Sequence, residues 1–231
     1  MDPQSKIEKI KSFVYGLSII IFPIMLFIGF IMHPDITSFK IMTTAEELAN
    51  NFRHNANYHI GHLIVAISIP FIILSLVCFM EKLRGKGIWF GLIGGLIGIF
   101  GSVILALDKG SLCLVLSAFN TLPDDKFIQL IPYLQVIVDR ESLLKITYLL
   151  SLLPLGAIIQ TIGLMRERII SKPQGIAIAL GLLLLNNPDI EIISSIGTAL
   201  MIAGYLPLGI KIMKKKQLQQ GVSHFHELAA V

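Results

Sequence analysis

Histidines are the residues of this 231-residue sequence best suited to chemistry, and four of the six lie between positions 33 and 62. His59 and His62 are three residues apart, which places both imidazoles on one face of a helix. Such a pair can ligate a metal ion, and His33, Asp35 or Asp108 can complete the ligand set. The imidazoles can also bind another ligand, relay protons, ligate haem, or bond to loop carbonyls at a membrane boundary. The spacing leaves these alternatives open.

Further ionisable and amide side chains follow the apolar segments of the chain. Ionisable residues at membrane depth are costly and mark functional sites by default. We therefore expect a ligand-binding site near the outer membrane face, with an aspartate beside the imidazoles making it pH-responsive near neutrality. Its candidate residues are His33, His59, His62, Asp108 and Lys109, with Asn186 and Asp189 at the rim, and its candidate metal ligands are His59 and His62.

The elements that must position these residues are membrane spans. Hydrophobic residues make up 54% of the chain and charged residues 15%, with a mean hydropathy of +0.77. Soluble domains contain roughly 45–50% apolar and about 25% charged residues. Because the excess lies in long uncharged runs, the sequence excludes a soluble enzyme, a disordered chain and a disulfide scaffold. It predicts an integral membrane protein.

The apolar runs predict an all-α fold, a six-transmembrane-helix bundle with an outer amphipathic interfacial helix. A span needs about 20 apolar residues. We expect one transmembrane domain over 13–210, with spans near 13–32, 60–79, 88–107, 146–165, 173–187 and 190–210. The fifth is short, and short helices often mark binding sites in transporters. The remaining segments, 1–12 and 211–231, are a cytoplasmic N-terminus and a cytoplasmic C-terminal tail.

Basic residues orient the predicted bundle. With both termini in the cytoplasm, the inner segments contain Lys6, Lys9, Lys11, Lys82, Arg84, Lys86, Arg166, Arg168, Lys172, Lys211, Lys214, Lys215 and Lys216. The other six of the 19 Lys and Arg residues are then outside. The positive-inside rule therefore favours a multi-pass protein of the cell membrane with both termini cytoplasmic. The same clustering makes the lipid bilayer the partner of these charges and argues against nucleic acid.

Glycines are concentrated in the third predicted span. Gly91, Gly94, Gly95 and Gly98 form two overlapping pairs at four-residue spacing, which lets helix backbones touch. We expect this helix at the centre of the bundle. Its glycine face can pack within the chain, or it can contact a second copy or another membrane protein.

Two outer segments complete the prediction. Residues 108–119 either continue the third helix or lie in the interface. The polar and apolar residues of 122–143 predict an amphipathic helix that lies in the outer interface and bends at Pro132. This helix is either a lid or a passive connector.

The pattern as a whole favours a protein that binds or transports a small molecule or ion through an outward-facing polar cavity. The first alternative is a metal- or haem-dependent membrane enzyme or redox subunit that uses the histidines. The second is a regulatory or partner subunit of a membrane complex. The sequence names neither a cofactor nor a reaction.

Overall fold

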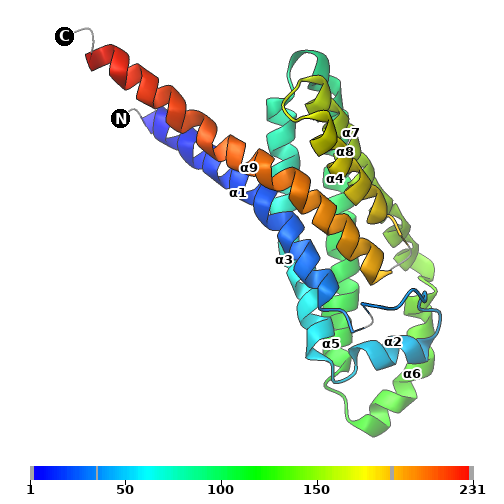
Figure 1. Cartoon of the computed structure of the whole chain (residues 1–231). Coiled ribbons are helices and arrows are strands. Elements are labelled where there is room, and N and C mark those ends of the chain that lie inside the picture. Colours follow the sequence, from blue (N-terminus) through cyan, green and yellow to red (C-terminus); the bar gives the residue numbers. More distant parts are fainter. Residues whose placement is uncertain (1–2, 35, 188–189, 229–231) are drawn as a thin grey trace.

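The structure, a computed structural model, describes residues 3–34, 36–187 and 190–228, with side chains as far as Lys214. Every regular element in these residues is helical (Figure 1). The main helices are α1 (Pro3–Ile31), α2 (Ala45–Phe52), α3 (Ala56–Lys82), α4 (Ile88–Lys109), α5 (Leu116–Phe119), α6 (Asp124–Val138), α7 (Leu152–Arg166), α8 (Lys172–Leu184) and α9 (Glu191–Leu228). Between them lie the 3-10 helices η1 (Gly85–Gly87) and η3 (Ser142–Ser151) and a π-helical segment, η2 (Gly110–Val115).

Five segments of the described chain are long and apolar enough to cross a membrane: Pro3–Ile31, Ala56–Lys82, Gly85–Phe119, Ser142–Arg166 and Glu191–Lys214. The fifth predicted span is the short helix α8, whose 13 residues are about 20 Å long, less than the ~30 Å hydrocarbon core. The six-span expectation is therefore reduced to five full-length candidates and one short apolar helix.

The helices also extend further than expected at both termini. α1 begins at Pro3, within the segment 1–12, and α9 continues to Leu228, within the segment 211–231. Figure 1 shows both chain ends at the same end of the bundle, which we call the terminal end. The other end carries α2, α5 and α6 and is called the cap end.

The six long or apolar helices pack in a closed ring. α1 contacts α3 and α9, α4 contacts α3 and α7, and α8 contacts α7 and α9. Lipid gives helices no hydrophobic reason to associate, so close backbone contact must hold them together. Glycines provide it: a Cβ added at Gly156 of α7 would lie 2.3 Å from the backbone N of Gly98, and one at Gly181 of α8 would lie 2.4 Å from the carbonyl of Gly197.

The glycine-rich helix α4 is one member of this ring, and its predicted central position is wrong. Its outward face exposes large apolar side chains, namely Leu92, Ile93, Leu96, Phe100 and Val103. Its four predicted packing glycines are buried against α3 and α7 of the same chain. The small-residue face is thus used for packing within the chain.

The interior of the ring is mainly apolar, with some buried serine, threonine and glutamine side chains. Tyr205 of α9 is fully buried between Phe22 of α1, at 5.1 Å between ring centroids, and Phe79 of α3, at 6.0 Å. Gln160 of α7 is also buried, and its amide donates to the carbonyls of Leu76 and Gly91, so it links α7 to α3 and α4.

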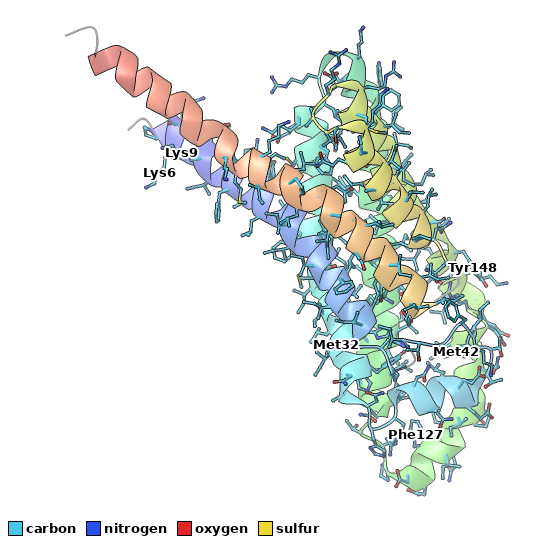
Figure 2. The ribbon with its side chains drawn as sticks, viewed as in Figure 1. Lys6, Lys9, Met32, Met42, Phe127 and Tyr148 are labelled. Atoms are coloured by element: carbon cyan, nitrogen blue, oxygen red, sulfur yellow. The ribbon has the colours of Figure 1, made fainter. Side chains whose placement is uncertain are left out.

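A second hydrophobic core forms a cap on the ring. Phe52 and Leu48 of α2 pack with Leu116 of α5 and with Phe127 and Leu134 of α6. The first alternative for residues 108–119 is correct, because α4, η2 and α5 continue as one helical segment that carries Leu116 into this core. The predicted amphipathic helix is present as α6, but its apolar side packs on α2 of the same chain. Figure 2 shows Phe127 in the cap and Lys6 and Lys9 at the terminal end.

Candidate functional site

Four separate elements deliver ionisable side chains to the junction between ring and cap. His33 follows the last turn of α1, and His62 lies in the second turn of α3. Asp108 and Lys109 end α4, and Glu191 begins α9. The start of α3 is fixed by its N-cap, because the Asn55 side chain accepts the backbone N–H of Tyr58. We call His33, Tyr58, His62, Asp108, Lys109 and Glu191 the junction cluster.

Aromatic rings form one side of the junction cluster. The His62 ring lies 4.2 Å from the Tyr58 ring and 5.6 Å from the His33 ring, measured between centroids. His33 and Tyr58 are 5.2 Å apart. The Nδ1–H of His62 donates to the Tyr58 carbonyl at 2.9 Å, which leaves Nε2 as the nitrogen that can take up a proton.

One ion pair and one contact between a histidine and a carboxylate form the other side. The Lys109 ammonium is 3.0 Å from the Asp108 carboxylate, and their side chains are only 16% and 6% exposed. His33 Nε2 is 3.5 Å from Glu191 Oε1, with both side chains 14% exposed. Ions removed from water need partners, and each of these charges has one.

The expected pairing of histidine with Asp108 is replaced by a different arrangement. Asp108 is committed to Lys109, and the carboxylate that meets an imidazole is Glu191. His62 interacts electrostatically with Lys109, His33 and His59. Sequence reasoning placed Glu191 at a span boundary without assigning it to the site. Its depth, at the start of the last span, matched that of Asp108 and was the signal that could have found it.

His59 points away from the other imidazoles and toward α2. Its Nε2–H donates to the Phe52 carbonyl at 3.1 Å, and its own carbonyl accepts from the Cys113 thiol. The two predicted metal ligands therefore bond to different carbonyls, His59 to that of Phe52 and His62 to that of Tyr58. Among the described residues, no group of three or more His, Cys, Asp or Glu side chains is placed to hold a metal ion.

The predicted rim residues lie at the α8–α9 turn. Asn186 is exposed, and Asp189 lies outside the described residues. Asn187, which sequence reasoning did not select for the site, closes the turn: its amide donates to the Leu184 carbonyl and to the Ser194 hydroxyl, and its oxygen accepts the backbone N–H of Ile190. These bonds end α8 and begin α9.

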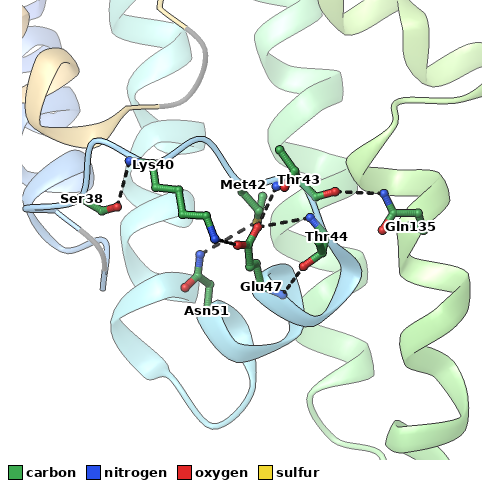
Figure 3. A network of polar contacts seen from close by, with 8 residues as sticks. All are labelled: Ser38, Lys40, Met42, Thr43, Thr44, Glu47, Asn51 and Gln135. Atoms are coloured by element: carbon green, nitrogen blue, oxygen red, sulfur yellow. Dashed lines mark hydrogen bonds and ion pairs between the residues drawn. The ribbon is translucent and has the colours of Figure 1, made fainter.

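A polar network holds the loop that leads from α1 to the cap (Figure 3). Glu47 of α2 accepts from the Lys40 ammonium and from the backbone N–H groups of Thr43 and Thr44. These donors stabilise the carboxylate and lower the pKa of Glu47 from 4.5 to about 2. Gln135 of α6 donates to the Thr43 carbonyl, so the loop is tied to both cap helices.

Arg53 joins the cap helices on the other side. Its guanidinium donates to the carbonyls of Asn120 and Leu122 and to the Asp124 carboxylate, and it stacks on Phe127 at 4.2 Å from the ring centroid. The same guanidinium lowers the pKa of Asp124. The cap is thus a bonded structure, and it lies beside the junction cluster because Tyr58 belongs to both.

Comparisons with protein-family models, with curated proteins and with solved structures found no match for this chain, so its function is inferred from its own geometry.

Proposed function

We propose that this protein is a proton-binding multi-pass membrane protein that binds or moves a small solute or ion at its junction cluster. The observation that carries the proposal is the convergence of His33, His62, Asp108, Lys109 and Glu191 from four elements in largely buried positions. Structural helix packing has no need for five ionisable groups at one depth. In membrane proteins such groups mark ion pathways and proton relays.

The chemistry of the junction cluster favours a proton as the first ligand. Its charges already pair with one another, so a proton is the ligand that can enter without displacing a side chain. Protonation of His62 at Nε2 adds a positive charge facing Lys109, and protonation of His33 strengthens its contact with Glu191. Proton uptake therefore changes the balance between the His33–Glu191 contact and the Lys109–Asp108 ion pair.

The location of the cluster suggests how protonation reaches the cap. His62 contacts Tyr58, and Tyr58 packs with Phe52 of α2 at 6.2 Å between ring centroids. A changed His62 charge thus acts on the residue that joins ring and cap. We propose that the cap end faces outward, because the basic clusters gather toward the terminal end and basic residues favour the cytoplasmic side.

Histidine titration tests the proposal directly. We expect nuclear magnetic resonance of isotope-labelled histidine in nanodiscs to show that His33, which faces the Glu191 carboxylate, changes protonation between about pH 5 and 8. Resonances are assigned with His33→Gln and His62→Gln, and Lys109→Met should shift the His62 midpoint. His54→Gln is the matched control, because this exposed cap histidine faces the surface carboxylate of Asp124.

A flux measurement then separates binding from transport. Proteoliposomes with an internal pH dye and an imposed potential should acidify with the unaltered protein and with His54→Gln, but not with His62→Gln. Titration without flux favours solute binding over transport. If His33 and His62 both keep one protonation state from about pH 4 to 9, the proposal is wrong.

A further inference from the structure

A basic cavity opens at the terminal end, far from the junction cluster along the helices. It has a volume of about 560 Å³ and lies between the end of α7, the start of α8 and the middle of α9. Four cationic side chains line it: Arg166, Arg168, Lys172 and Lys211. None of the described residues that line it is acidic. The volume falls within the ~300–1,000 Å³ range of small-molecule sites.

Two carboxylates at the same end of the bundle are engaged elsewhere. Glu167, in the α7–α8 turn itself, accepts the backbone N–H of Gly87 at 2.6 Å and so binds the α3–α4 turn. Glu81 pairs with Lys11 at 2.8 Å and accepts from the Tyr15 hydroxyl. Among the side chains that the structure describes, no carboxylate lines the cavity, and its positive charge can meet an external anion.

Hydrogen bonds hold the cavity open in a defined shape. Lys211 of α9 donates to the Ile169 carbonyl at 2.7 Å, and Gln174 of α8 donates to the Gly204 carbonyl at 2.6 Å. Ser171 caps α8 by accepting the Gln174 backbone N–H. The first turn of α8 thus borders the cavity and adds the positive end of its helix dipole to the four cations.

We infer that this cavity binds a phosphate-bearing anion, and that the anion is the headgroup of an anionic phospholipid. Apolar side chains, among them Met165, Ile170 and Leu208, line the cavity together with the cations. A mixed lining of this kind suits a headgroup whose glycerol and acyl portions remain attached. Basic pockets between membrane helices on the cytoplasmic side are known to bind such headgroups. A soluble phosphate ester offers the same anion without the apolar portion.

Two double variants with equal loss of charge test the site. Arg168→Gln with Lys172→Gln removes two cations from the cavity. Lys82→Gln with Lys86→Gln removes two exposed cations from the neighbouring α3–α4 turn at the same end, outside the cavity lining. The full chain is placed in phosphatidylcholine nanodiscs with or without phosphatidylglycerol, and bound phosphatidylglycerol is counted by native mass spectrometry. Thermal unfolding verifies that both variants fold.

The cavity variant should bind phosphatidylglycerol roughly thirtyfold more weakly, from about 1 kcal/mol per cation near a membrane and about 1.4 kcal/mol per factor of ten. The turn variant should bind it as the unaltered protein does. Calorimetry with inositol hexakisphosphate in phosphatidylcholine nanodiscs is the second arm. Binding of this probe with the same variant pattern, but no retained phosphatidylglycerol, assigns the cavity to a soluble phosphate and overturns the lipid assignment. Equal losses in the two variants, or no binding of either probe, overturn the site.

Discussion

The contact between α4 and α7 leaves no room for one methyl group, and Gly156→Ala measures how much the fold depends on it. A Cβ at Gly156 would lie 2.3 Å from the N and 2.6 Å from the Cα of Gly98, and 2.5 Å from the carbonyl oxygen of Gly94. All three are backbone atoms of a helix, so no side-chain rotation relieves the overlap. The two helices must separate along their contact.

The expected loss of stability follows from two opposing effects. Overpacking a well-packed core costs typically about 1–3 kcal/mol, and a clash with backbone belongs at the upper end of that range. Alanine recovers roughly 1 kcal/mol because glycine is a poor helix former. The net free energy of unfolding should fall by about 2 kcal/mol. For a chain of this size each kcal/mol shifts Tm by roughly 2–4 °C, so we expect a Tm lower by about 4–8 °C.

The two cysteines supply the assay. Cys78 and Cys113 are 0% and 4% exposed, so a fluorogenic maleimide should react with them when the helices separate on heating. Gly110→Ala is the matched control, because a Cβ there meets nothing within 4 Å. Since alanine is also the better helix former at this position, the control should melt roughly 2–4 °C above the unaltered protein. If Gly156→Ala melts at or above the Tm of the unaltered protein, the argument from close backbone contact fails.

Three other outcomes are expected at the cap and the chain ends. The folded pKa of Glu47 lies at about 2, below its ordinary 4.5, so its contribution to cap stability is present above pH ~4.5 and disappears as the pH falls toward 2. Protection of the α2 amides in hydrogen exchange should fall over the same pH range. Glu47→Gln, which leaves Lys40 without its carboxylate, should abolish this pH dependence. Arg53→Lys should accelerate limited proteolysis of residues 120–123, because one ammonium cannot replace a planar fork that serves three acceptors; an unchanged cleavage rate contradicts this role. An impermeant maleimide should label Thr43→Cys in intact cells but Lys9→Cys only after permeabilisation, and the reverse pattern would invert the proposed orientation.

The sequence could predict which residues lie at the same end of neighbouring helices, but it could not predict the direction in which each side chain points. The apolar runs placed His33, His62 and Asp108 at one level, and the structure does bring His33 and His62 together, with Lys109 acting on His62. The direction of His59 depends on where α2 lies, and nothing in the spacing of residues specifies that. The prediction for α4 was wrong because its four packing glycines indicate close contact without indicating on how many sides of the helix it occurs.

The order of the helices around the ring could not be predicted from the sequence either. In water, an apolar stripe tells a helix which side faces the core, but lipid is as apolar as leucine and removes that distinction. Glycine pairs such as Gly181 with Gly197 specify the contacts instead, and a single sequence shows the glycines without showing which of them meet. The cap is different, because Phe127 and Leu134 of α6 already formed a recognisable apolar stripe.

In the continuous helical segment Gly85–Phe119, the number of residues determines the direction in which the side chains at its cap end face. Its 35 residues extend about 52 Å, and because they form one helix, a rotation of its ring portion also rotates its cap portion. A π-helical turn contains one residue more than an α-helical turn, and here it occupies Gly110–Val115. Because the wider turn absorbs the extra residue, deleting one residue of it would restore α-helical winding and leave the segment beyond it facing the same way. The same deletion within the α-helical part of α4 would instead rotate everything beyond it by roughly 100°. Leu116, now fully buried in the cap, would then face a different direction.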